Sequence, residues 1–400
     1  MRPRNTGSST KNRIRLTAKR AVIGLVILAS LVVWGNLRIA NNINFIRNTE
    51  NNNNDNNRKN VMDPTELAQL MASRPEVTSP SGGAAACLLV MDDNHFLIEW
   101  IAYHYHTLPL RYLVLAVDPR SKTDPNDVLD RWQGVGNFTI VTWYQDSDYA
   151  TEQEFEVARK QARDYFGDEH SDELIQHRAR QRMFYYKCMH HLKEQGRHWT
   201  ALIDTDEYLS LSYETLQKYG RVDVPAISQP GSVLKFLNKE LQRPDAYENI
   251  TSPCIQIPRI RFGTKESKED EVAARVPAGF AGSSFQTLRW RRHVGENNFA
   301  ANKISKTLID LQRVSYDELQ PVDSIHRPLR SLCGHRKLHI RKSEQALIIH
   351  HHIGTWEQFS FREDARQEMD GRSREVKQKT RFQSNTHVHA FWHSHRNNSH

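Results

Sequence analysis

Two aspartates that directly follow an apolar run are the residues of this chain whose spacing points most clearly to chemistry. Residues 199–203 (WTALI) have the length and composition of a buried strand, and Asp204 and Asp206 come next. The carboxyl ends of strands in an α/β sheet open into the crevice where ligands bind. Two carboxylates there need a compensating charge, which a divalent cation that also binds phosphate oxygens supplies. The pattern therefore predicts a Mn²⁺ or Mg²⁺ site and a diphosphate ligand; the alternative is a solvated acidic turn.

The elements that would position these aspartates alternate between strand and helix. Continuous apolar runs predict strands at 84–91, 111–117, 138–143 and 199–203, and helical spacing predicts helices at 96–105 and 171–194. This alternation predicts an α/β fold with a mostly parallel central sheet. The pattern is less regular further on, where we expect a helix at 236–241 and strands at 255–262, 285–292 and 306–311, with a short apolar run at 346–349.

The positive charge of the chain is concentrated at its N-terminus. The first twenty residues carry seven of the eight net positive charges. A basic nucleic-acid-binding surface is therefore not expected on the remainder. Residues 21–37 are uncharged and would span roughly 25 Å as a helix, which is enough for a thin bilayer. The excess of basic residues before this stretch predicts a cytosolic N-terminus, and the alternative is a cleaved secretory signal.

The resulting organisation is a basic cytosolic tail (1–20), a transmembrane signal anchor (21–37), a flexible stalk (38–83), one lumenal domain (84–370) and a polar tail (371–400). Four cysteines lie in the lumenal part and allow three disulfide pairings, among which the sequence does not choose. Cys87 lies in an apolar run, so a buried thiol is an equal alternative there. Sequons predict N-glycosylation at Asn137, Asn249 and Asn397.

Six stretches of the chain carry further motifs: 93–105 (DNHFLIEWIAYHY), 180–188 (RQRMFYYKC), 204–209 (DTDEYL), 303–307 (KISKT), 324–328 (SIHRP) and 352–357 (HIGTWE). Together they resemble glycosyltransferase family 92 and its family-2-like relatives, over about residues 86–366. The resemblance implies a GT-A fold, a type II Golgi membrane protein, and metal-dependent transfer of a sugar, with galactose as the family-level expectation, from a UDP-sugar to a glycan hydroxyl. The relatives usually carry Lys-Asn-Glu where this chain has Asp92-Asp93-Asn94. This departure supports the alternative of a non-catalytic, lectin-like or adhesive protein that keeps the fold.

The resemblance and the residue types together define a candidate site. The expected metal ligands are Asp204, Asp206, His326 and His352, with His350 and His351 as competitors of His352. The expected nucleotide-sugar contacts are Asn94, Glu99, Asp118, Arg182, Asp204 and Lys306, with Arg180 and Lys303 as further phosphate donors. For Asp118 the alternative is a turn aspartate, for Glu99 a paired helix carboxylate, and for the basic residues a solvated surface.

The catalytic base and the outcome of the reaction stay open. Inverting transfer needs a carboxylate base, for which Glu266, Glu271, Glu296 and Asp323 are unranked candidates, whereas a retaining enzyme needs none. A third hypothesis is a metallohydrolase whose ion is held by His350, His351 and His352. It would retain metal binding after Asp206→Ala and lose it when these histidines are replaced.

Overall fold

The computed structural model of the chain describes residues 82–133, 135, 137–167, 171–218, 229–241, 253–262, 285–289, 304–321, 326, 328–329, 332–333 and 346–352. All of them belong to the second of two compact units, Met62–His400. The expected tail, membrane span and C-terminal tail, nearly all of the stalk, and the sequons at Asn249 and Asn397 lie outside the described residues. Within the part that is described, no helix has the length and apolar character to cross a bilayer.

The central sheet is mostly parallel, as the alternation of elements predicts. Its strands are β1 (Ala84–Val90), β2 (Leu110–Val117), β3 (Thr139–Trp143), β4 (Trp199–Leu202), β6 (Cys254–Ile257) and β8 (Lys306–Asp310). Their order is β3-β2-β1-β4-β8-β6. Strands β3, β2, β1 and β4 run parallel, and β8 is antiparallel to both of its neighbours. Since β4 pairs with β1, the residues after β4 lie at the edge of the sheet where the parallel strands end.

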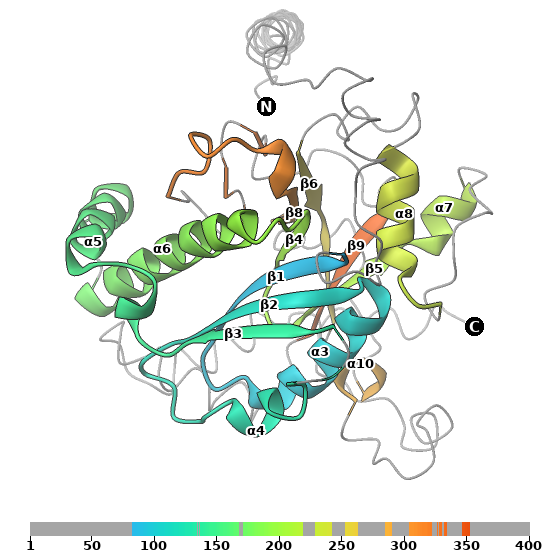
Figure 1. Cartoon of the computed structure of the whole chain (residues 1–400), viewed down its shortest axis with the longest axis horizontal. Coiled ribbons are helices and arrows are strands. Elements are labelled where there is room, and N and C mark those ends of the chain that lie inside the picture. The colour runs from blue at the N-terminus through green and yellow to red at the C-terminus, as the bar shows by residue number, and fades with distance from the viewer. Residues whose placement is uncertain are drawn as a thin grey trace, which may run out of the picture. The chain divides into compact units, whose positions relative to one another are not determined.

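Helices cover both faces of this sheet, which explains why β1 reads as a continuous apolar run. The even-numbered residues of β1 belong to one hydrophobic core and the odd-numbered residues to the other. Helix α3 (Asn94–Thr107) contributes to the first core, and α6 (Asp172–Glu194), with α5 (Glu152–Phe166) packed against it, contributes to the second. Figure 1 shows α3 and α6 on opposite sides of the sheet. The shorter helices are α4 (Asn126–Leu129), α7 (Tyr213–Lys218), α8 (Ser232–Leu241) and α10 (Gln286–Arg289), with 3₁₀ turns at Asp146–Asp148 and Leu311–Arg313.

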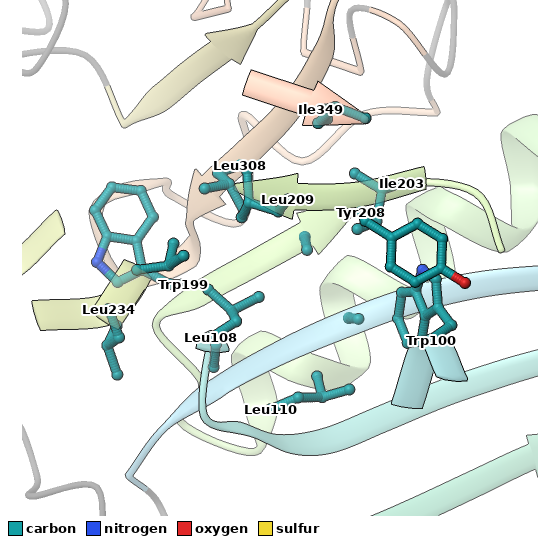
Figure 2. Close-up of a cluster of buried hydrophobic side chains, with 14 of the residues drawn as sticks. Trp100, Leu108, Leu110, Trp199, Ile203, Tyr208, Leu209, Leu234, Leu308 and Ile349 are labelled. Carbon is teal, nitrogen blue, oxygen red and sulfur yellow. The ribbon is translucent and has the colours of Figure 1, made fainter. Parts of the chain in front are cut away.

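A second, small sheet lies next to the first and was not predicted from the sequence. It consists of β5 (Glu207–Leu211), β9 (Leu347–His352) and β7 (Arg259–Phe262), in the order β5-β9-β7. Strand β9 is antiparallel to β5 and parallel to β7. Figure 2 shows Trp100 of α3 beside Tyr208 of β5 within the first core, which therefore joins the two sheets.

Three expectations about the elements were wrong or incomplete. Residues 286–289 of the expected strand 285–292 form helix α10, because the Glu99 carboxylate accepts hydrogen bonds from the backbone N–H and the hydroxyl of Thr287. The expected strand 255–262 is two strands, β6 and β7, separated by Pro258, which has no N–H to donate. Helix α5 was not predicted, although Thr151 and Glu154 form a capping box at its start.

The four cysteines form two disulfides. Cys87 of β1 is bonded to Cys188 of α6, and Cys254 of β6 is bonded to Cys333. The alternative of a buried free thiol at Cys87 was therefore wrong. Both bonds connect segments that are about 80 to 100 residues apart in the chain. Such bonds stabilise the fold mainly by restricting the unfolded chain.

Candidate active site at the acidic turn

The two aspartates lie at the point where the order of the parallel strands reverses. Strands β2 and β3 lie on one side of β1, and β4 lies on the other. Asp204 and Asp206 follow β4 in a tight turn, which the N–H of Glu207 closes by donating to the carbonyl oxygen of Asp204 at 3.1 Å. We call Asp204 to Glu207 the acidic turn. It lies where open α/β sheets bind their ligands.

An ion cluster joins two residues of the acidic turn, Asp204 and Glu207, to Arg259 of β7 and Lys306 of β8. Nζ of Lys306 is 2.7 Å from Oδ2 of Asp204 and 3.2 Å from Oε2 of Glu207. Nη1 of Arg259 donates to Oε1 of Glu207 at 2.9 Å. The side chains of Lys306 and Glu207 are fully buried, whereas that of Asp204 is 42% exposed. Asp204 is therefore the member of the cluster that a ligand reaches.

The charges of the cluster hold both ends of its Asp204–Lys306 pair ionised. Desolvation raises the pKa of Asp204, but the Lys306 ammonium outweighs it and the pKa lies below its usual range. Desolvation lowers the pKa of Lys306, but Asp204 and Glu207 outweigh it and the pKa lies above its usual value. Lys306, which we expected to bind phosphate, is thus paired with two carboxylates inside the protein.

Asp206 faces a histidine on the neighbouring strand β9. Nε2 of His351 lies 3.4 Å from Oδ2 of Asp206. Asp206, Glu207 and His351 each offer one ligand atom, and these atoms all lie within 4.8 Å of one another. Carboxylate oxygen suits Mn²⁺ and Mg²⁺, and imidazole nitrogen suits transition-metal ions better than Mg²⁺. Both oxygens of Glu207 already accept hydrogen bonds, one of them from the N–H of Asp204. We therefore regard Asp206 and His351 as the pair that fits a cation, with the exposed carboxylate of Asp204 two residues away.

The two histidines expected as metal ligands have different surroundings. Nδ1 of His326 lies 3.0 Å from the carbonyl oxygen of Ser305, so it carries the proton and Nε2 carries the lone pair. Burial and the charges of Lys306 and Arg259 lower the pKa of His326 to about 2. The ring of His352 stacks on Phe262. The backbone N–H of His352 donates to the backbone carbonyl oxygen of Asp206 at 2.8 Å. A metal-binding role for His326 and for His352 stays a prediction.

The Asp118 carboxylate lies in a second ion cluster, after β2. Its oxygens accept hydrogen bonds from Arg120 at 2.7 and 2.9 Å and from Arg180 at 3.3 Å, and Nδ1 of His177 is 3.6 Å away. Burial raises the pKa of Asp118, but Arg120, His177 and Arg180 together hold it well below its usual range. Arg180 also forms two hydrogen bonds with Asp146. Contact between Asp118 and a nucleobase stays a prediction.

The other expected nucleotide contacts are spread over the domain. Nδ2 of Asn94 donates to the carbonyl oxygen of Asp124 at 2.7 Å, and Glu99 accepts from Thr287. Arg182 donates to Gln161 of α5, so it lies on the side of α6 that faces α5. Asn137, the described sequon residue, is exposed before β3. The structure does not bring Arg182 to the acidic turn; its neighbour Arg180 lies beside Asp118.

The acidic loop at residues 92–94 has a structural role. Oδ1 of Asp92 accepts hydrogen bonds from the N–H groups of Lys122 and Thr123 at 2.7 and 2.9 Å. Oδ2 of Asp93 accepts from the N–H of Met91 at 3.1 Å. The two carboxylates thus bind the backbone of the loops that follow β1 and β2. Asp92 and Asp93 therefore stabilise the fold at this edge of the sheet.

Helix α3 holds the acidic turn by the indole of Trp100. Its Nε1–H is shared between the carbonyl oxygens of Asp204 and Glu207, at 3.1 and 3.0 Å. Both carbonyls belong to the turn, and the Trp100 side chain is fully buried. The donor therefore sets the position of the turn relative to α3.

Two further side chains of α3 bind the free edge of β5. The Tyr103 hydroxyl donates to the carbonyl oxygen of Leu209 at 3.0 Å, and Nε2 of His104 accepts from the N–H of Leu209 at 3.2 Å. Nδ1 of His104 donates to its own helix, at the carbonyl of Trp100. We call Trp100, Tyr103 and His104 the α3 clamp.

Reasoning from sequence missed the roles of Arg259 and the α3 clamp, and it named His351 only as a competitor of His352. The clamp residues are spaced i, i+3 and i+4, which places them on one face of a helix, and this signal was present in the sequence. No comparable signal marks Arg259 or distinguishes His351 from His350 and His352, because Arg259 and His351 reach the site through strand pairing with distant segments.

Comparisons with known proteins give a distant similarity. No protein-family model and no curated protein matches the chain. Among solved structures, it is similar to the mannosyltransferase Ktr4p from S. cerevisiae in complex with GDP, with a TM-score of 0.29 and 11% identity over 64% of this chain and 70% of that chain. A second structure of Ktr4p gives a TM-score of 0.30 and 11% identity over 66% and 70%. Ktr4p is a glycosyltransferase, the class that the resemblance implies. The function proposed below depends on the geometry of the site itself.

Proposed function

We propose that the chain is a glycosyltransferase that moves a sugar from a nucleotide diphosphate donor to a hydroxyl group of a glycan. The observation that carries the proposal is the acidic turn at the switch point of the parallel strands, with Asp206 next to His351 and the Asp204 carboxylate exposed. A UDP-sugar, with UDP-galactose as the first to test, a Golgi location and a single N-terminal membrane span belong to the same proposal.

The acidic turn fits Mn²⁺ or Mg²⁺, which Asp206 and His351 would hold together with Asp204. A bound ion would neutralise the charge that develops on the diphosphate leaving group. The chain's own residues orient the site. Lys306 pairs with the Asp204 carboxylate, and Glu207 accepts from the N–H of Asp204. The indole N–H of Trp100 donates to a carbonyl oxygen of the turn. Rate enhancement would then come from stabilising the leaving group and from positioning the acceptor.

The experiment that tests the proposal is donor hydrolysis by the full chain. A panel of UDP-sugars is incubated with Mn²⁺ or with EDTA, and released UDP is measured. We expect one donor to be hydrolysed in the presence of Mn²⁺ and not in the presence of EDTA. Asp206→Asn should lower the rate of this hydrolysis by about 100-fold. Asp130→Asn, which changes an exposed carboxylate after α4, is the matched control and should keep the rate. Equal rates in Asp206→Asn and the parent chain would refute the assignment of the site.

The non-catalytic alternative has less support. Its basis was the unusual 92–94 loop, and the hydrogen bonds of Asp92 and Asp93 explain that loop as a part of the fold. Binding of UDP without hydrolysis of any donor would favour it. The metallohydrolase alternative assumed a histidine site apart from the aspartates, but His351 lies against Asp206. Metal binding should therefore be lost by replacing either residue.

A further inference from the structure

Two buried side chains of the second sheet have hydrogen-bonding groups that the described part of the chain does not satisfy. The Tyr208 hydroxyl and both ring nitrogens of His352 have no hydrogen-bond partner among the described residues. Tyr208 is 0% exposed and His352 is 1% exposed. A tyrosine hydroxyl is a donor, and an imidazole carries at least one N–H in either protonation state. Because buried donors in native proteins nearly always have an acceptor, these two groups indicate a site for one.

Strand pairing places the two side chains on the same face of the second sheet. Tyr208 of β5 lies directly opposite His350 of β9, so the two share a face. Successive residues of a strand point to opposite faces, which puts His352 on the face of Tyr208 and His351 on the other. The ring centroids of Tyr208 and His352 are 5.3 Å apart, and the ring of His352 stacks on Phe262 at 4.5 Å. We call Tyr208 and His352 the polar pair.

The ring of Tyr208 is fixed by two rings of helix α3. It packs against Tyr103 edge to face, with centroids 5.4 Å apart, and parallel to His104 at 6.0 Å. Figure 2 shows its hydroxyl at the end of the ring that points away from Leu209 and Leu308. The hydroxyl is therefore held in one position by the fold, as recognition of a ligand group requires.

The polar pair adjoins the acidic turn. Tyr208 follows Asp206 by two residues, and the backbone N–H of His352 donates to the carbonyl oxygen of Asp206 at 2.8 Å. In a nucleotide sugar, the sugar is bonded directly to the terminal phosphate of the diphosphate. A diphosphate bound at the acidic turn thus brings the sugar next to the polar pair. A sugar hydroxyl both donates and accepts, so it can bond a tyrosine hydroxyl and an imidazole together.

We propose that Tyr208 and His352 bind a hydroxyl group of the donor sugar and thereby help to select the donor. The inference rests on the proposed function and assigns residues to the sugar. It gives His352 a role on the face opposite His351, in place of the expected metal ligation. A site built to bond a hydroxyl group discriminates against an analogue without it, because its buried groups are then left unpaired. The competing occupant of the site is a buried water molecule.

Tyr112→Phe provides a matched control for Tyr208→Phe. Each substitution removes one hydroxyl group and keeps the aromatic ring. The Tyr112 hydroxyl has a partner inside the protein, Nε2 of His191 at 2.9 Å. Tyr112 pairs with Ala85 near the start of β1, at the edge of the sheet opposite the acidic turn. Its loss should therefore affect stability and leave the binding of ligands at the turn unchanged.

The first part of the test is calorimetric titration of the full chain, in Mn²⁺, with UDP and with a panel of UDP-sugars that includes UDP-galactose and UDP-glucose. For the UDP-sugar that the parent chain binds, Tyr208→Phe should weaken the affinity by about three- to tenfold, because one hydrogen bond to the sugar is lost. The affinity for UDP, which has no sugar beyond the diphosphate, should stay unchanged. His352→Phe, which keeps a ring to stack on Phe262, should give the same pattern. Mn²⁺ should tighten UDP binding in this variant as it does in the parent, since His352 is not a metal ligand.

The second part is thermal unfolding of the same variants without ligand. Tyr208→Phe should unfold at the parental temperature or above it, because its hydroxyl has no partner in the protein to lose. Tyr112→Phe should unfold at a lower temperature, because it loses the hydrogen bond to His191. A ligand-binding hydroxyl is thus distinguished from a structural one.

Two results would overturn this inference and leave the proposed function intact. One is parental affinity of Tyr208→Phe for both UDP and the UDP-sugar. The other is a Tyr208→Phe variant that is destabilised as much as Tyr112→Phe, which would identify a buried water molecule or another internal group as the partner of the hydroxyl. A parent chain that binds neither UDP nor any UDP-sugar would overturn the proposed function, and this inference with it.

Discussion

At the scale of single residues, Glu207 is held by other charged groups and donors of the site, which makes it a stabilising residue more than a ligand. It lies within 4.8 Å of the ligand atoms of Asp206 and His351, which would suit a three-residue metal site. However, its side chain is fully buried, and its oxygens accept from Arg259 and from the N–H of Asp204 while Lys306 lies 3.2 Å away. A carboxylate with this set of donors has little capacity left for a cation. Its function is to hold Asp204 and the two buried cations in place.

Glu207→Gln should therefore lower the stability of the fold. Replacing a carboxylate by an amide leaves Lys306 and Arg259 undercompensated in a buried site, which costs about 3 to 5 kcal/mol. Urea denaturation at pH 7 measures the change, and Asp130→Asn on the surface should stay within about 0.5 kcal/mol of the parent. A Glu207→Gln variant with parental stability and no Mn²⁺ binding would instead identify Glu207 as a ligand.

At the scale of elements, helix α3 completes the second sheet. One edge of β5 pairs with β9, and the α3 clamp provides donors and an acceptor for the other edge. Such side-chain partners substitute for a neighbouring strand and also protect the edge from pairing with another chain. Because the indole N–H of Trp100 donates to two carbonyl oxygens of the acidic turn, the position of the turn depends on the position of α3.

Trp100→Phe should separate the positioning of the acidic turn from the stability of the core. Phenylalanine keeps most of the buried aromatic volume but removes the N–H donor, so two buried carbonyls lose a partner at a cost of about 1 to 3 kcal/mol. We expect Mn²⁺-dependent UDP binding to weaken by at least about tenfold in protein that is still folded. Thr107→Val on the same helix removes a hydrogen bond to the carbonyl of Tyr103 and should leave UDP binding unchanged. Parental UDP affinity in Trp100→Phe would contradict the clamp's role.

Part of this architecture was predictable from the sequence, for identifiable reasons. The strands β1 to β4 are apolar runs with clear breaks, and the aspartates come directly after β4, so the central sheet and the acidic turn followed from local pattern. The second sheet did not, because its strands are short and pair across about 140 residues, as Glu207 does with His351. For the same reason His351 could not be preferred over His350 or His352. The helical turn at Thr287 depends on Glu99, which is 188 residues away.

At the scale of the whole molecule, buried neutral histidines link stability to pH. Burial lowers the pKa of His104 to about 3, although its hydrogen bond with the carbonyl oxygen of Trp100 acts in the opposite direction. The pKa of His326 is lowered to about 2, and those of His351 and His352 are lowered in the same direction. Below about pH 6.5 the unfolded chain binds protons at these rings while the folded chain does not. Their contribution to stability is therefore present above pH 6.5 and is lost as the pH falls.

We expect the free energy of unfolding to fall by at least about 1.4 kcal/mol per pH unit between pH 6 and pH 4, as one such histidine requires, and more steeply if several contribute. Denaturation curves over this range measure the slope. His104→Gln should reduce the slope by about 1.4 kcal/mol per pH unit, whereas Thr107→Val, on the same helix and without a titrating group, should shift the curve without changing its slope. A flat profile in the parent chain would show that these rings are not held neutral.

The most direct measurement is the affinity of the full chain for UDP, determined by calorimetry with Mn²⁺ and with EDTA, in the parent and in Asp206→Asn. If the acidic turn holds a cation that in turn binds the diphosphate, Mn²⁺ should tighten UDP binding by at least about tenfold in the parent and should have no effect in Asp206→Asn. UDP affinity that is the same with Mn²⁺ and with EDTA in the parent chain would contradict the central claim.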